Sequence, residues 1–119
     1  MGIGYMDRMI LSSFTSKEKQ AFYQLLCGAM IIDGDRDPRE KAVIEHVMEL
    51  IGLTDQERQA SRLSSTESQI ATMKAMDESK KKYLGKYMAQ VILADGIVTP
   101  KEQGWFNFML NLLEIPDIE

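Results

Sequence analysis

Two short stretches of the chain combine carboxylates with glycine and proline, and they follow one template. Asp33, Asp37 and Glu40 lie in the first stretch, and Asp95 and Glu102 lie in the second, 62 residues after their counterparts Asp33 and Glu40. Hard divalent cations are bound in proteins by several carboxylate and carbonyl oxygens. Two such loops could hold one divalent cation between them if the fold brings them together. The candidate metal ligands are Asp33, Asp95, Glu40 and Glu102.

The two glutamates also fit a purely structural role. Asp37 precedes Glu40 by three residues, and Thr99 precedes Glu102 by three, with a proline between the members of each pair. This spacing is typical of a helix start, where the glutamate bonds a backbone N–H and favours the helix dipole. Helix capping is therefore the preferred interpretation of Glu40 and Glu102.

The aspartates of the two Asp-Gly pairs are harder to explain in this way. Asp33 and Asp95 follow predicted helices, and the negative end of a helix dipole disfavours a carboxylate unless its own loop donates N–H bonds. Asp33 and Asp35 resemble the beginning of an EF-hand loop. However, Pro38 replaces the required glycine and Ile44 replaces the required glutamate, so an EF-hand is excluded.

Catalytic groupings are absent from the sequence. His46 is the single histidine and lacks the second histidine of a zinc-protease motif, so we expect it to lie on the surface. Cys27 lies beside a predicted apolar face and is expected to be a small core residue. We therefore expect no enzyme, and a metal-dependent hydrolase using the same carboxylates is the alternative. That alternative requires the carboxylates to meet in one pocket.

Apolar residues at three- and four-residue spacing indicate the elements that would position these loops. Capping boxes, prolines and glycines mark their ends, and no segment alternates long enough to be a strand. The sequence predicts an all-α bundle of about six or seven helices. Residues 1–14 could form a short helix whose buried face consists of Met6, Met9, Ile10 and Phe14. The longer helices are expected at residues 15–32, 37–52, 78–94 and 99–115, with short ones after residues 54 and 65.

The apolar pattern repeats along the chain with the same 62-residue offset as the acidic loops, which indicates an internal duplication. The corresponding pairs are Ile31 and Leu93, Ile44 and Phe106, Val47 and Met109, Met48 and Leu110, Ile51 and Leu113, and Leu53 and Ile115. We expect an N-terminal segment of residues 1–14 and one domain of residues 15–119, with halves of about 16–53 and 78–115. A twofold arrangement would bring the apolar stripes of both halves into one core.

Two surface features have alternative interpretations. The run Lys80-Lys81-Lys82 does not form one stripe on a helix and is expected to be a solvated face, with docking to an acidic partner as the alternative. The aromatic residues Trp105, Phe106 and Phe108 cover more than one side of the last helix. Core packing explains most of them, and an exposed one would mark a groove for a partner.

Composition excludes several classes of protein. The net charge of −4 disfavours a non-specific nucleic-acid binder. The chain has no apolar run long enough to span a membrane and no secretory signal pattern. One cysteine cannot form an internal disulfide, so we expect a soluble cytoplasmic protein in a reducing compartment.

The helix–Asp-Gly–loop–helix motif resembles the tellurite-resistance TerB family and the wider TerB-like group. The stretch from Val91 to Glu102 carries Ala-Asp-Gly before a Thr-Pro helix start, and the stretch from Met30 to Glu40 has isoleucine in place of the alanine. The resemblance implies an internally duplicated helical bundle found in bacteria and associated with stress resistance. We expect an interaction module with a protein partner, for which a divalent cation at the acidic loops would be a regulator. A homodimer or adaptor is the structural alternative.

Overall fold

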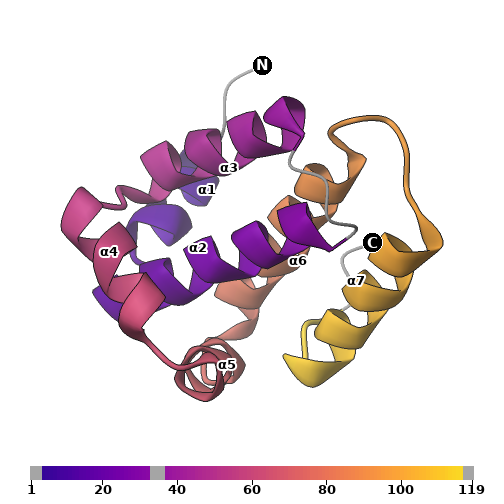
Figure 1. Ribbon diagram of the computed structural model, residues 1–119. Coiled ribbons are helices and arrows are strands. Elements are labelled where there is room, and N and C mark those ends of the chain that lie inside the picture. The colour runs from indigo at the N-terminus through magenta and orange to yellow at the C-terminus, as the bar shows by residue number, and fades with distance from the viewer. Residues whose placement is uncertain (1–3, 33–36, 117–119) are drawn as a thin grey trace.

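The described residues of the computed structural model, 4–32 and 37–116, form a bundle of seven α-helices without strands (Figure 1). The predicted all-α class is thereby confirmed. The helices are α1 (Tyr5–Ser12), α2 (Ser16–Ile31), α3 (Pro38–Ile51), α4 (Asp55–Leu63), α5 (Thr66–Lys74), α6 (Glu78–Leu93) and α7 (Pro100–Leu112). Within these residues, no helix combines the length and apolar character needed to cross a membrane.

Helices α2 and α6 form the centre of the bundle. Figure 1 shows α2 crossing the middle with α6 behind it, while the other helices surround this pair. Phe22 and Leu26 of α2 and Leu84, Met88 and Val91 of α6 are fully buried. These residues recur at three- and four-residue spacing, so each central helix turns one apolar stripe into the shared core.

The helix boundaries follow the two-part template of the sequence. α2 and α6 begin at Ser16 and Glu78, and α3 and α7 begin at Pro38 and Pro100, in both cases 62 residues apart. Local signals set these boundaries: a threonine or aspartate N-cap precedes each helix, and proline stands at the first helical position of α3 and α7. Gly52 ends α3 in the left-handed conformation at φ 73°. The shared boundaries fit an internal duplication, which stays a prediction.

The N-terminal segment forms α1, but its inner face differs from the predicted one. Met6 and Met9 are exposed, whereas Leu11 and Phe14 are buried against the core. α1 packs against α3 and α6, and the Tyr83 hydroxyl donates a hydrogen bond to Asp7. The prediction for Met6 and Met9 was wrong because the helix is short, so its neighbours decide which side is covered.

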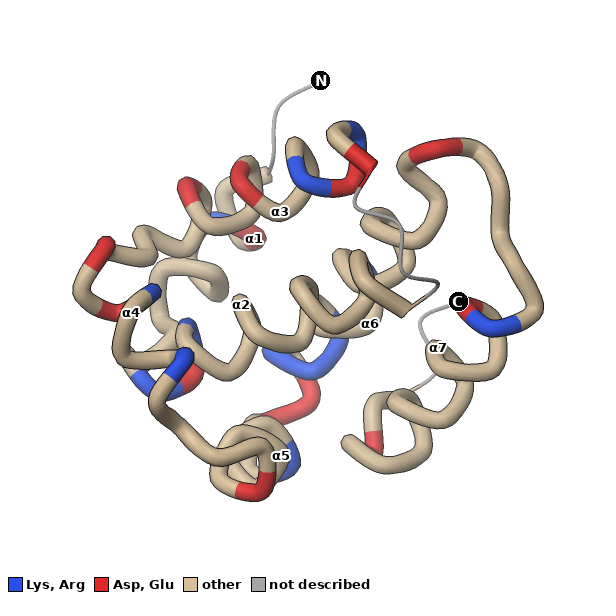
Figure 2. Tube along the Cα trace, viewed as in Figure 1, with Lys and Arg blue, Asp and Glu red and all other residues tan. Residues whose placement is uncertain are grey.

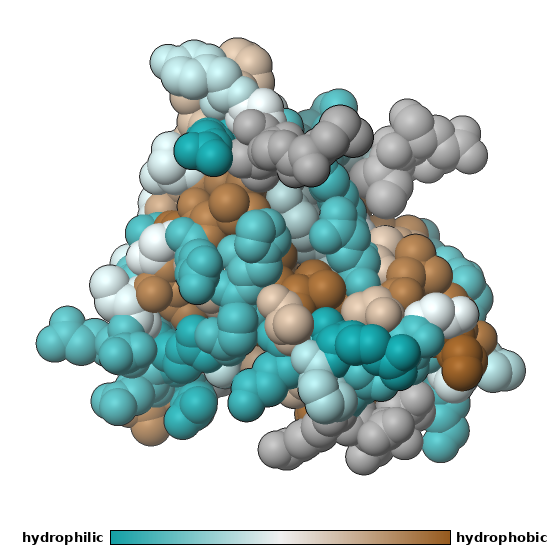
Figure 3. All heavy atoms as spheres, turned by 90° about the horizontal axis from the view of Figure 1, so that it is seen from above, coloured by the Kyte–Doolittle hydropathy of each residue, from teal (hydrophilic) through white to brown (hydrophobic). Residues whose placement is uncertain are grey.

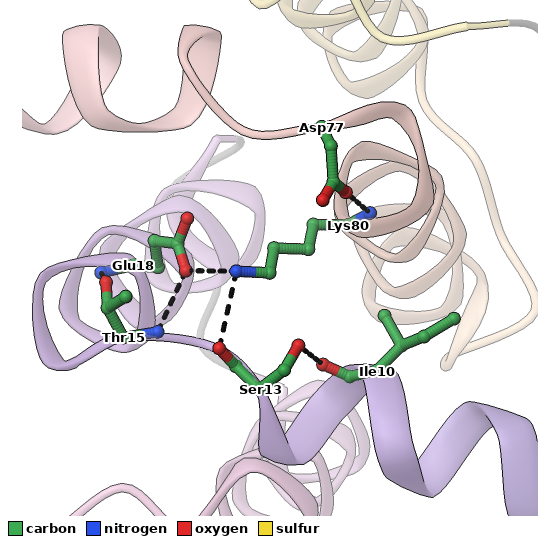
Figure 4. Close-up of polar contacts among 6 residues, drawn as sticks. All are labelled: Ile10, Ser13, Thr15, Glu18, Asp77 and Lys80. Atoms are coloured by element: carbon green, nitrogen blue, oxygen red, sulfur yellow. Dashed lines mark hydrogen bonds and ion pairs between the residues drawn. The ribbon is translucent and has the colours of Figure 1, made fainter.

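The lysine run on α6 is not a solvated face as a whole. Lys80 Nζ lies 2.7 Å from Glu18 Oε1 and 3.3 Å from the carbonyl oxygen of Ser13, joining α6 to the start of α2 (Figure 4). Lys81 is buried and donates to the carbonyl oxygen of Glu114 at 3.5 Å. Among the three lysines only Lys82 is exposed. The run therefore ties helices together, since two of its ammonium groups satisfy oxygens of other segments.

Candidate functional site

Asp95, one of the two predicted aspartate ligands, lies in the loop between α6 and α7. Its Oδ1 atom accepts a hydrogen bond from the backbone N–H of Ile97 at 3.0 Å. Gly96 follows at φ 80°, in the left-handed region that a glycine adopts without strain. This loop N–H bond compensates for the unfavourable place of a carboxylate after a helix. The other aspartate, Asp33, lies outside the described residues.

Glu102 is 2% exposed and completes a capping box at the start of α7. Its Oε1 atom accepts the N–H of Thr99 at 2.9 Å, and Thr99 Oγ1 accepts the N–H of Glu102 at 3.1 Å. One carboxylate oxygen is thus used by the helix start, as the preferred interpretation predicted.

Glu40 is equally buried, at 3% exposed, at the corresponding place of α3. Asp37 is the N-cap of this helix, as predicted. Asp37 Oδ1 accepts the N–H of Arg39 at 2.7 Å, and the two Asp37 oxygens also bind the Arg39 guanidinium, with one contact of 2.8 Å. These hydrogen bonds from Arg39 hold the pKa of Asp37 below its usual range. The Asp37 carboxylate therefore caps α3 through the N–H of the second helical residue and also binds the side chain of that residue.

The start of α3 and the loop after α6 lie at the same end of the molecule. The pKa of Arg39 is raised, chiefly by its hydrogen bond with Asp37 and further by the charge of Asp95. Figure 2 shows the charged start of α3 beside the acidic loop that follows α6. Even so, the described residues contain no group of three or more His, Cys, Asp or Glu side chains placed to hold a metal ion. Divalent-cation binding at these loops stays a prediction.

The single histidine and the single cysteine occupy different settings. His46 is exposed on α3, as predicted. Cys27 is only partly buried, and burial raises the pKa of its thiol above the usual value despite a hydrogen bond from Tyr23. A thiol with a raised pKa is mostly protonated near neutral pH and is a weak nucleophile.

A groove of about 320 Å³ lies between α5 and α7, with α2 as its floor. Each wall presents side chains at relative positions i, i+3, i+4 and i+7 of its helix. The α5 wall consists of Thr66, Gln69, Ile70 and Met73, and the α7 wall consists of Trp105, Phe108, Met109 and Leu112. Each wall therefore spans about two turns of its helix.

The floor and the mouth of the groove are also formed by specific residues. Gly28 of α2 lies beside the Trp105 ring, since a Cβ at this glycine would be in van der Waals contact with Trp105 Cζ2, at 3.4 Å. Phe108 is 61% exposed at the groove, although it is large and apolar. No charged side chain lines the groove among the residues the structure describes. The result is an apolar surface with a neutral polar margin of Gln24, Thr66 and Gln69.

The other side of α7 is partly open as well. Leu93, Ile97 and Val98, at the end of α6 and in the loop that follows, are exposed. Seen from above, hydrophobic atoms reach the surface on the right-hand side, which carries α7 and this loop (Figure 3). The sequence indicated the site only through aromatic residues on more than one side of the last helix. The contributions of α2 and α5 were missed, because their spacing is the same as that of ordinary core residues.

Comparisons with known proteins agree with this architecture. Residues 6–63, from α1 to the end of α4, match the family model described as tellurite resistance protein TerB. A crystal structure of a protein of unknown function from Porphyromonas gingivalis W83 has a TM-score of 0.76 and 23% identity; the alignment covers 98% of this chain and 87% of that one. The search of curated proteins found no match. The family match bears out the resemblance seen in the sequence: residues 6–63 are similar to the TerB family, and the solved structure shares the all-helical fold.

Proposed function

We propose that this TerB-like module acts by docking an amphipathic helix of a partner protein in the groove between α5 and α7. The observation that carries the proposal is the pair of helical walls, each with side chains at positions i, i+3, i+4 and i+7. Phe108, in the α7 wall, is exposed to solvent. A helix is recognised in a groove through apolar anchors at the same spacing. The occupant would therefore present three or four apolar side chains over two turns.

The polar margin of the groove defines the partner further. Because Gln24, Thr66 and Gln69 are neutral, they favour hydrogen-bonding side chains rather than charges next to the apolar anchors. Aromatic residues in partly covered pockets are the side chains that most often dominate binding energy at interfaces. Trp105 and Phe108 have this role in the proposal. A link to tellurite or stress resistance is suggested by the description of the matching family.

A pull-down from native extract tests the proposal with two matched variants. Phe108→Asp places a charge in the groove, and Leu63→Asp places the same charge on another exposed apolar residue, 89% exposed and not part of the groove. We expect the partner to be lost with Phe108→Asp and retained with Leu63→Asp. Circular dichroism and melting curves would show that both variants remain folded.

The binding segment is then identified by a photo-cross-linker at position 108. Cross-links to an amphipathic helix of the captured protein support the proposal, whereas capture that is insensitive to Phe108→Asp contradicts it. A second copy of this chain as the cross-linked species, with a dimer in light scattering, would instead support the homodimer alternative. Repeating the capture with a chelator shows whether a divalent cation contributes.

A further inference from the structure

A second pocket, of about 600 Å³, lies between α2, α3 and α4 and is separate from the groove at α7. Each of the three helices contributes a pair of ionisable residues one turn apart. These pairs are Tyr23 and Cys27 on α2, Lys41 and Glu45 on α3, and Arg58 and Arg62 on α4. Neither the family match nor the proposed docking role assigns a function to this pocket.

Arg58 and Glu45 hold the inner part of the pocket in place. The guanidinium forms two hydrogen bonds with the carboxylate, at 2.9 and 3.0 Å, and donates a third to the Tyr23 hydroxyl at 3.3 Å. The Arg58 Cζ atom also lies 4.7 Å from the centre of the Tyr23 ring. Arg58 lowers the pKa of Glu45, so this pair remains ionised and its charges cancel.

The remaining charges of the pocket are both positive. Lys41 and Arg62 are exposed, and within the described residues neither forms an ion pair. The lining thus carries three cations and one carboxylate, in a protein whose net charge is −4. Cys27 does not offset this excess, since its raised pKa keeps the thiol neutral. Cationic side chains in a concave surface attract anions and bind them by charge-assisted hydrogen bonds.

The rest of the wall is apolar. Met30, Pro38 and Ile44 line it together with the neutral Cys27 thiol. A pocket of a few hundred Å³ with an apolar wall and a few placed polar groups is typical of small-molecule sites. From this combination we infer that the pocket binds a small organic anion, with a phosphate or carboxylate head toward Lys41 and Arg62 and an apolar body against Met30 and Ile44.

Amide chemical shifts of the ¹⁵N-labelled full chain test this assignment with four probes: phenyl phosphate, benzoate, inorganic phosphate and phenol. We expect saturable shifts around Cys27, Lys41 and Arg62 with phenyl phosphate or benzoate. The stronger of these two identifies the preferred head group. Inorganic phosphate and phenol should bind more weakly, because each provides only half of the recognised chemistry.

Variants that each remove one positive charge test whether the pocket cations bind the probe. Lys41→Gln and Arg62→Gln should each raise the Kd of the preferred probe about fivefold, as expected for one partly exposed ion pair. Lys82→Gln, which removes an exposed lysine of α6, should leave it unchanged. Shifts that do not saturate, that occur away from the pocket, or that survive in the Lys41→Gln/Arg62→Gln double variant would overturn the inference. Neither outcome bears on the docking groove, since the linings of the two sites share no residue.

Discussion

Helices α3 and α7 begin in the same way but have different surroundings. Each starts with a proline and holds a buried glutamate at its third position. On α3, Ile44, Val47 and Met48 are buried, because the helix packs against α1, α2 and α6. The corresponding residues of α7 are only half-buried, since α7 packs mainly against α6 and α2. One sequence pattern thus produces a core helix in one place and an incompletely covered helix in the other.

The comparison separates two roles of an apolar stripe. Burial of apolar surface stabilises the fold in proportion to the area removed from water. The α3 stripe provides this stabilisation within the chain, whereas the α7 stripe retains apolar surface that a partner can still cover. A helix with incomplete cover is therefore the natural place for docking in this molecule.

Two methionine substitutions give the largest expected effect. Met48→Ala on α3 removes a side chain that is 2% exposed and should lower the free energy of unfolding by about 2–5 kcal/mol. Met109→Ala on α7 removes a half-buried one and should cost about 1 kcal/mol. Urea denaturation monitored by circular dichroism measures both. Equal losses would contradict the difference between the helices; a loss for Met109→Ala that grows with protein concentration would indicate self-association.

The helix starts provide a second, smaller contrast. Thr99→Ala removes one half of the α7 capping box and should lower stability by about 1 kcal/mol. Asp37→Asn on α3 keeps an acceptor for the Arg39 N–H and should have a smaller effect at neutral pH. Its effect should appear in the pH dependence. The Asp37 pKa is lowered in the folded state, so its contribution is present above the usual aspartate range and is lost as pH falls through the lowered pKa.

Melting curves of the wild type and Asp37→Asn between neutral and acidic pH measure this second contrast. The two proteins should converge in stability once the wild-type carboxylate is protonated. If the difference in stability between the two proteins were constant over the whole pH range, Asp37 would act through its shape rather than its charge.

The smallest expected effect concerns the predicted divalent cation at the two loops. Free Ca²⁺ or Mn²⁺ at a concentration equal to its Kd would stabilise the wild type by about 0.4 kcal/mol, and Asp95→Asn should reduce this gain. Calorimetric titration and melting temperature measure binding directly. If neither calcium, magnesium, manganese nor zinc produces heat or raises the melting temperature, the loops serve only as helix connections.

The candidate site shows what a sequence pattern can miss. The last helix carries aromatic residues on more than one side, namely Trp105, Phe106 and Phe108. This pattern indicated that one of them would be exposed, and Phe108 is exposed. The opposite wall on α5 could not be predicted, since Ile70 and Met73 have the spacing of ordinary core residues. The pocket of Lys41 and Arg62 was missed for a related reason: these charges meet only because α3 and α4 both pack on α2.

The sequence by itself determined the helices and most of their ends, because caps, prolines, glycines and apolar periodicity act within one or two turns. Thr15, Thr54 and Thr99 each form the predicted capping box. Tertiary structure decided which faces are covered, since the same pattern can meet different neighbours. It exposed Met6 and Met9, buried Lys81, and left α7 open where α3 is closed. Burial depends on contacts between distant segments, and a local pattern specifies only one side of each contact.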